Sequence, residues 1–253
     1  MLMTAALGSG TPSPSPLKHV QFGKLDRTYP VDYHNHTKWT DGTASADEMA
    51  QAASKAGIRE FLFSEHVRST STYFPEFAKT IRALAVDGLT IYLGVEAKVL
   101  DMRGTLDAPA DIESLCDAII GSVHSPPNDD GTSGSWKEYT PSQALEKELQ
   151  LALSIVTHSR AHIIGHPLGM VITKFGLQPR EELLAIARAC ALSGKAFELN
   201  PRYSLDPNTM IEIVTEAGCK VNIGSDAHFT DAVGSSWKKF VLGSEPMARR
   251  SAS

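Results

Sequence analysis

Short apolar runs alternate with longer stretches of helical periodicity along most of this chain. The runs are only a few residues long and nearly continuous in apolar residues, which is typical of strands that are buried on both faces. Seven of them are interpreted as strands, at residues 30–33, 60–63, 90–95, 118–123, 162–165, 196–199 and 220–223. Four follow a glycine, the residue in which helices often end: Gly57, Gly88, Gly194 and Gly218.

Helical stretches connect the predicted strands. Ser45 with Glu48 and Thr140 with Gln143 have the spacing of a capping box, which marks the start of a helix. Helices are expected at about residues 45–56, 72–87, 141–158, 180–193 and 207–217. Regular alternation of strands and helices predicts parallel β-α units, which either close into a barrel or remain an open sheet.

The first segment of the chain has a different character. Residues 1–28 are rich in Pro, Ser and Gly and show no apolar period. We expect them to be a disordered tail or an expression remnant. The remaining residues, 29–253, are expected to form one domain, because their number suits a single hydrophobic core.

Histidines and carboxylates gather where the predicted strands end. The chain has nine histidines, and six of them follow predicted strands directly. Three carboxylates share these positions. In parallel α/β folds the carboxyl ends of the strands carry the ligand site. The candidate ligands are His34, His36, Asp41, His66, Glu96, His124, His166, Asp226 and His228.

These residue types indicate a metal cluster. Imidazole suits transition metals, and a carboxylate can bridge two ions. Nine ligands are too many for one ion, so two or three divalent ions are expected, and mixed nitrogen and oxygen ligands admit zinc, manganese or iron. The other three histidines are interpreted as structural or surface residues: His19 in the tail, His158 at a helix end and His162 at a strand start.

The ordered set of motifs resembles the PHP family, named for polymerase and histidinol phosphatase. The resemblance covers about residues 31–230. It implies a distorted (β/α)7 barrel with the metal site at the carboxyl ends of the strands. The motifs are His34-x-His36 with Asp41-Gly42, Glu65-His66, Gly94-x-Glu96, His124, Gly165-His166-Pro167 and Ser225-Asp226-x-His228.

The resemblance also implies a division of the ligands. One ion would be held by His34, His36, Glu96 and Asp226. Glu96 would bridge to a second ion, held also by His124 and His166. The third would be held by Asp41, His66 and His228. No ligand position is lost, which favours an active enzyme over a metal-binding module without catalysis.

The favoured activity is hydrolysis of a phosphate monoester on a small metabolite, with histidinol phosphate as a candidate from the resemblance alone. Two ions would lower the pKa of a bridging water and present hydroxide to phosphorus. Glu96, Asp226 and His228 are the expected catalytic residues, and Asp226, His228 or a metal-bound water would protonate the leaving group. Arg202 and Arg68 are candidate phosphate ligands, since a guanidinium binds phosphate through two bonds.

Two further activities remain open: a phosphodiesterase or exonuclease on nucleotides, and a C–N hydrolase of the related metal-barrel type. The formal net charge of −5 argues against a long nucleic acid as substrate. No run is apolar over enough residues to span a membrane, and no export signal opens the chain. Three widely spaced cysteines suit a reducing compartment, so a cytoplasmic location is expected, while the oligomeric state stays open.

Overall fold

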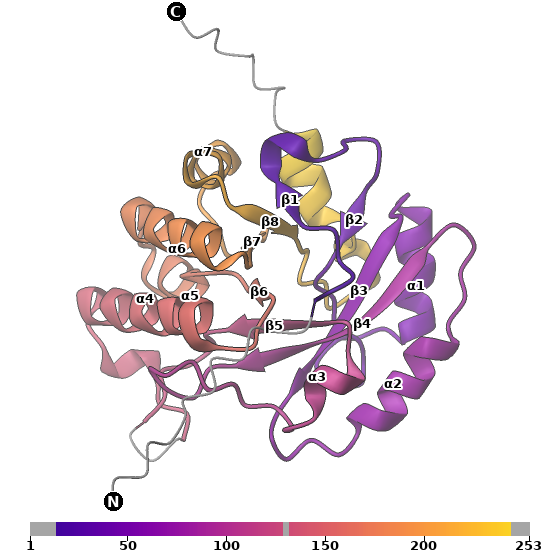
Figure 1. Cartoon of the computed structure of the whole chain (residues 1–253), viewed down its shortest axis with the longest axis horizontal. Coiled ribbons are helices and arrows are strands. Elements are labelled where there is room, and N and C mark those ends of the chain that lie inside the picture. Colours follow the sequence, from indigo (N-terminus) through magenta and orange to yellow (C-terminus); the bar gives the residue numbers. More distant parts are fainter. Residues whose placement is uncertain (1–13, 129–131, 244–253) are drawn as a thin grey trace, which may run out of the picture.

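The computed structural model describes residues 14–128 and 132–243. Its strands form one sheet in the order β1-β8-β7-β6-β5-β4-β3-β2 (Figure 1). β1 is antiparallel to β8, and every other neighbouring pair is parallel. The strands are β1 Val20–Gln21, β2 Val31–Asp32, β3 Glu60–Val67, β4 Thr90–Lys98, β5 Ala118–Ser122, β6 Ile163–Ile164, β7 Ala196–Leu199 and β8 Lys220–Ile223.

All seven predicted strands are present as β2 to β8, and the predicted parallel α/β fold is confirmed. β3 and β4 extend beyond the predicted runs and include His66 and Glu96, because polar side chains on one face do not end a strand. β2 and β6 are shorter than predicted, at two residues each.

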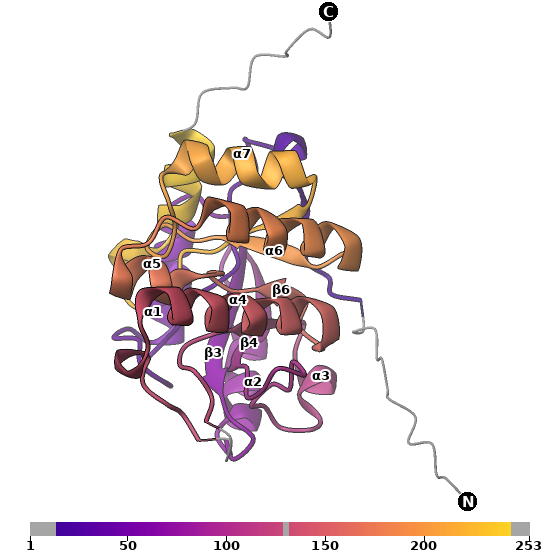
Figure 2. The same cartoon turned by 90° about the vertical axis from the view of Figure 1, so that its left-hand side faces the viewer.

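Helices lie outside the sheet, with α4, α6 and α7 side by side on one flank (Figure 2). The capping boxes at Ser45 and Thr140 are both formed. The short helices α3 and α5 were not predicted, because they have too few residues to show a helical period. Over the described residues, no helix has the length and apolarity that a membrane span requires. The helices are α1 Ala46–Lys55, α2 Phe74–Ala83, α3 Ile112–Leu115, α4 Pro141–His158, α5 Gly169–Phe175, α6 Arg180–Ser193, α7 Pro207–Ala217 and a π-helix Trp237–Leu242.

The two ends of the parallel sheet meet. The backbone N–H of Tyr33, just after β2, donates to the carbonyl of Ile223 in β8 at 2.8 Å. Further on, the His36 N–H donates to Ala227 O at 2.9 Å, and Asn35 forms a parallel bridge with Ala227. β1 pairs only with the start of β8. The first and last parallel strands are therefore neighbours, as a distorted barrel requires.

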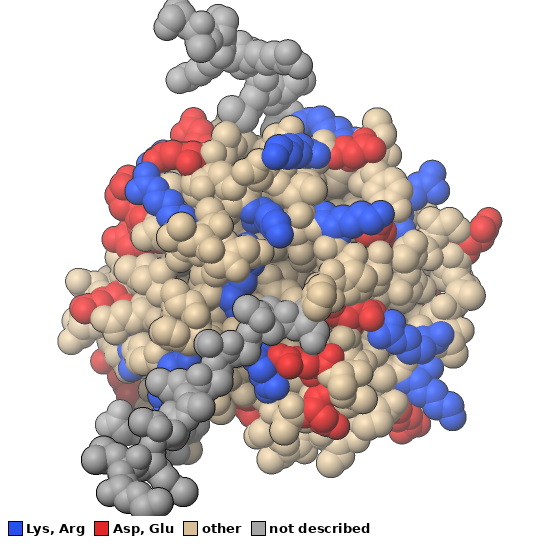
Figure 3. Space-filling model, in the orientation of Figure 1, with Lys and Arg blue, Asp and Glu red and all other residues tan. Residues whose placement is uncertain are grey.

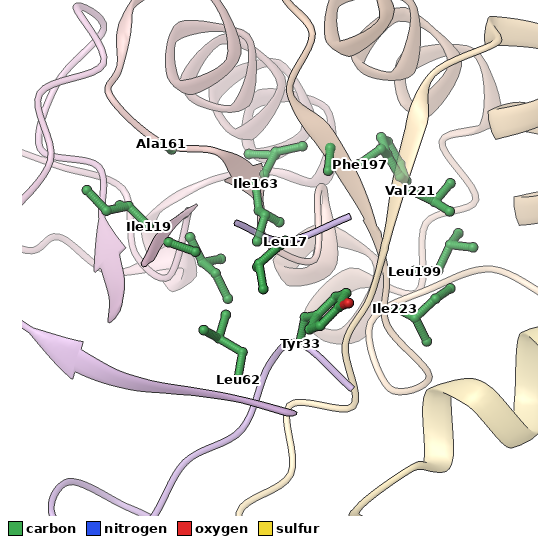
Figure 4. Close-up of a cluster of buried hydrophobic side chains, with 14 of the residues drawn as sticks. Leu17, Tyr33, Leu62, Ile119, Ala161, Ile163, Phe197, Leu199, Val221 and Ile223 are labelled. Carbon is green, nitrogen blue, oxygen red and sulfur yellow. The ribbon is translucent and has the colours of Figure 1, made fainter. Parts of the chain in front are cut away.

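The segment before β2 is part of the folded domain, so the predicted tail is wrong for residues 14–28. Leu17 is only 7% exposed and belongs to the hydrophobic core, where Figure 4 shows it among buried side chains from several strands. Phe22 is also buried. A two-residue strand and single inserted side chains leave no hydrophobic period to detect. Residues 1–13 of the predicted tail lie outside the described part of the chain.

We predict that Leu17→Ala destabilises the protein by about 2–4 kcal/mol, since truncating a buried leucine removes apolar contacts and leaves a cavity. Urea unfolding followed by circular dichroism measures the change. Leu192→Ala is the matched control, because Leu192 is 91% exposed. Equal stability of the two variants would show that the segment does not contribute to the core.

Candidate metal centre

Glu96 lies at the centre of the predicted ligands. Its side chain is 1% exposed at the end of β4. The register of β3 and β4 pairs it with His66, so both side chains project from the same face of the sheet. Glu96 Oε1 lies 3.1 Å from His124 Nε2 and 2.9 Å from His166 Nε2. Its Oε2 lies 3.0 Å from His66 Nδ1 and 3.4 Å from His34 Nε2.

The residues that follow β2 and β8 form the next part of the site. His34 Nε2 and His36 Nε2 are 3.1 Å apart, and His36 Nε2 is 3.1 Å from Asp226 Oδ1. Asp226 has a positive φ of 51°, a conformation that costs energy and that aspartate adopts more readily than most residues. This backbone turn directs its carboxylate toward the two histidines.

Asp41 joins the site from the loop after β2. Its Oδ2 lies 3.3 Å from His66 Nε2 and 3.2 Å from His228 Nε2. The loop is tied to the end of the barrel, because the Thr43 N–H donates to the carbonyl of His228 at 2.7 Å. Asp41 is half-exposed, unlike Glu96. The contact between β2 and β8 thus brings together ligands from opposite ends of the sequence.

Charges in the cluster are strongly coupled. Burial opposes ionisation of Glu96, but the surrounding histidines outweigh it and hold its pKa well below the usual value. Burial also opposes the charged form of His66, yet Glu96 and Asp41 raise its pKa to about 10. His36 responds in the other direction, since burial lowers its pKa to about 4. The carboxylates therefore need positive charge close by, whether protons or metal ions supply it.

The residues fit a group of divalent cations. Glu96 Oε2 is buried without a hydrogen-bond partner among the described residues, although it faces imidazole nitrogens. A cation at this place would satisfy it. Ligand atoms within 4.8 Å of one another form three groups: His36, Asp41, His66 and His228; His34, His36 and Asp226; His66, Glu96 and His124. His36 and His66 belong to two groups each, so the division implied by the resemblance stays a prediction.

A cavity of about 780 Å³ opens over these ligands. Arg68 and Arg202 both line it, together with Tyr73, Tyr203 and Met170. The guanidinium of Arg202 lies 5.1 Å from the centre of the Tyr203 ring, which in turn lies 5.0 Å from the ring of His166. Arg68 is 60% exposed and makes a 3.4 Å contact with Asp107. Both candidate arginines thus lie beside the cluster.

Two acidic residues of the site were given no role from the sequence. Glu198 in β7 contacts His34 Nδ1 at 2.7 Å and accepts a hydrogen bond from the His166 backbone N–H at 2.7 Å. Glu65, read only as part of a motif, accepts from the Thr37 N–H at 2.7 Å and so fixes the chain after His36. The signal for Glu198 was an acidic residue inside an otherwise apolar strand.

The raised pKa of His66 predicts proton release when metal binds. Below about pH 10 the metal-free protein keeps a proton on His66, and a metal ligand must be the neutral imidazole. Zinc affinity should therefore fall as the pH falls. Calorimetric titration with zinc at pH 8, in two buffers of different ionisation enthalpy, counts the protons released. His66→Ala should release fewer than the exposed-histidine control His158→Gln, and zinc binding by the unmodified protein without proton release would contradict the prediction.

Comparisons with known proteins agree with this geometry. The chain is 30% identical over 220 residues to a protein of Pectobacterium atrosepticum named "Probable phosphatase", with 81% of each chain covered. It is 30% identical over 211 residues to the DNA polymerase/3′-5′ exonuclease PolX of Bacillus subtilis, spanning 78% of this chain but 34% of that protein.

Solved structures and a family model complete the comparison. The structure of histidinol phosphate phosphatase from Lactococcus lactis, complexed with zinc, L-histidinol and phosphate, matches with a TM-score of 0.67 and 25% identity, covering 83% of this chain and 90% of that one. A Listeria monocytogenes structure shares the fold with a TM-score of 0.61 and 16% identity, covering 80% of this chain and 97% of that one. The model of the PHP domain matches residues 32–202. The ligand motifs, the barrel and these matches together establish that the chain belongs to the PHP family of phosphoesterases.

Proposed function

We propose that this protein is a metal-dependent phosphatase that hydrolyses a monoester of a small phosphorylated metabolite. The observation that carries the proposal is the buried Glu96 carboxylate, surrounded by imidazoles, beneath a cavity that two arginines also line. The Lactococcus lactis neighbour holds zinc, L-histidinol and phosphate. Several similar proteins carry the name "Probable phosphatase", which supports the same class of reaction.

Two or three divalent ions of zinc, manganese or iron, when bound, would neutralise the phosphoryl oxygens and lower the pKa of a coordinated water that serves as the nucleophile. Glu96 can hold two of them, since its two oxygens face different histidines. His34, His36 and Asp226 would hold one side of the cluster, and His124 and His166 another. Asp41, His66 and His228 form the most exposed part.

The leaving alkoxide needs a proton as the ester bond breaks. His228 and Asp226 both line the cavity, and His228 Nδ1 lies 2.9 Å from the carbonyl of Asp226. That contact suits donation from His228 Nδ1–H and orients the ring. His228 Nε2 faces Asp41 and would hold metal, so a His228 ring bonded in this way has no proton to give. We therefore propose that Asp226 or a coordinated water would protonate the alkoxide, with His228 held beside Asp226.

Arg202 is the residue we propose to hold the phosphate. The Arg202 backbone N–H donates to Asn200 Oδ1 at 2.9 Å, which fixes the turn after β7. The Tyr203 ring contacts both the Arg202 guanidinium and the ring of His166. Arg68, on the loop after β3, is the second candidate. A planar guanidinium can form two parallel hydrogen bonds to phosphoryl oxygens.

A phosphodiesterase or exonuclease activity on nucleotides is the second candidate. The match to PolX favours it, and the cavity volume admits more than a phosphate group. The net charge of −5 favours a small substrate over a long nucleic acid. Figure 3 shows the face that the amino-terminal segment crosses, where basic and acidic side chains are mixed. A C–N hydrolase has no specific support in the site.

A panel of phosphate monoesters and diesters, assayed with the zinc- or manganese-loaded protein, tests the proposal. Release of inorganic phosphate from monoesters is expected. Arg202→Ala should lower kcat/KM about 10- to 100-fold, since a hydrogen bond to a charged group contributes about 1.5–3 kcal/mol. Lysine at this position should restore only part of the loss.

The control is Arg188→Ala, which removes an exposed arginine paired with Glu216 and should leave kcat/KM unchanged. Metal content of every variant is measured alongside, so that a loss of metal is not read as a loss of phosphate binding. Hydrolysis of diesters with no activity on monoesters would replace the proposal by the second candidate. No hydrolysis of any phosphate ester by the metal-loaded protein would refute both.

A further inference from the structure

A line of hydrogen bonds crosses the barrel interior from the metal centre to the amino-terminal segment. His34 Nδ1 lies 2.7 Å from Glu198 Oε1. The same oxygen accepts from Asn222 Nδ2 at 3.1 Å, and Asn222 Oδ1 lies 2.9 Å from His19 Nε2. The participants come from four places in the sequence, namely the segment with β1, the end of β2, β7 and β8. These hydrogen bonds connect the four segments.

The direction of each hydrogen bond follows from the chemistry of the groups. A carboxylate only accepts, so Asn222 must present its NH₂ to Glu198 and its carbonyl oxygen to His19. His19 must then donate from Nε2. By the same reasoning His34 must donate from Nδ1, which in the neutral imidazole leaves the lone pair of Nε2 free to bind a metal. That nitrogen faces His36 Nε2 at 3.1 Å and Glu96 Oε2 at 3.4 Å.

The surroundings leave Glu198 little freedom to move. Its side chain is fully buried, and its second oxygen accepts the backbone N–H of His166 at 2.7 Å. A Cβ atom at Gly224 would overlap Glu198 Oε1 and would also approach His34 Cβ to 2.7 Å. Position 224 therefore has to be glycine for the carboxylate to occupy this place. The carboxylate thus touches two histidines of the metal centre and holds three donors.

We propose that Glu198 is a positioning residue for the metal centre, and that Asn222 and His19 hold it in place. It fixes the tautomer and the orientation of His34, so that Nε2 would be free to bind a metal ion. Hydrogen bonds of this kind commonly change metal affinity by 10- to 100-fold. The inference rests on the proposed metal function of His34, and it gives the segment before β2 a role at the site.

A purely structural role for the path would have a different signature. The line would then stabilise the folded chain equally with and without metal. A positioning role instead changes the free energy of metal binding, because the unbound His34 ring can adopt the wrong tautomer or turn away. Metal affinity and the stability of the metal-free protein therefore separate the two roles.

The test uses the full chain and zinc. Zinc affinity is measured by competition with a chromophoric chelator, and thermal unfolding is measured on the metal-free protein. Glu198→Gln puts an NH₂ in place of one carboxylate oxygen. Either His34 and Asn222, which share Oε1, lose their acceptor, or the His166 N–H, which uses Oε2, loses its acceptor. The affinity of this variant for at least one zinc ion should fall about 10- to 100-fold. In ¹⁵N-histidine NMR spectra, the Nδ1–H signal of His34 should weaken or shift.

Matched variants of His19 test the end of the path that lies farthest from the metal centre. His19→Phe keeps a ring against Tyr33 but removes the donor, and should lower zinc affinity about 5-fold, as expected for the loss of one hydrogen bond. His19→Gln keeps an N–H donor and should restore most of the affinity. Gln21→Ala is the control, because it breaks a 2.7 Å hydrogen bond from the adjoining strand β1 to Gly218 without touching the path.

Unchanged zinc affinity in Glu198→Gln would overturn the inference. A loss in His19→Phe that Gln21→Ala matches would do the same for His19, since it would reflect the strand rather than the path. Failure of the proposed function looks different. An unmodified protein that binds no divalent ion refutes the metal centre itself, whereas one that binds zinc with Glu198-dependent affinity but hydrolyses no phosphate ester refutes only the function.

Discussion

The burial of the Glu96 carboxylate is the constraint on which the rest of the structure depends. An ionised carboxylate that is 1% exposed is costly unless positive charge lies beside it. Histidines from β3 and from the ends of β2, β5 and β6 supply nitrogens within 3.5 Å. The buried carboxylate is stable when the surrounding imidazoles carry protons or when metal ions take the place of those protons. Bound metal ions would give the site its chemistry.

Closing the barrel is what makes this arrangement possible. The ligands after β2 and those after β8 are at opposite ends of the sequence, and backbone contacts between residues 33–43 and 223–228 bring them together. β1 and Leu17 cover the opposite end of the barrel, near the start of β8. The hydrogen-bonded path through His19, Asn222 and Glu198 connects the two ends. The hydrogen-bonded path thus couples packing at the amino-terminal end of the barrel to ligand geometry at the carboxyl end.

The sequence predicted the strands well, and the candidate ligands that it indicated converge in the structure, because each has a local signature. Their binding of metal stays a prediction. Apolar runs mark the strands, and a histidine or carboxylate directly after a run marks the site edge. Contributions without such a signature were missed. Leu17 fills the barrel as a single side chain, and Glu198 sits between Phe197 and Leu199, where only the fold reveals that it faces His34. The contact between Arg202 and Tyr203 likewise depends on an irregular turn, which has no sequence periodicity from which it could be predicted.

Anomalous diffraction from crystals of the zinc-loaded protein tests the central claim most directly, namely that Glu96 joins a cluster of more than one ion. The account predicts at least two anomalous peaks per chain within zinc–oxygen bonding distance of Glu96, about 2.0–2.2 Å, one at each carboxylate oxygen. A single peak, or peaks that leave Glu96 in contact with protein groups alone, would contradict it.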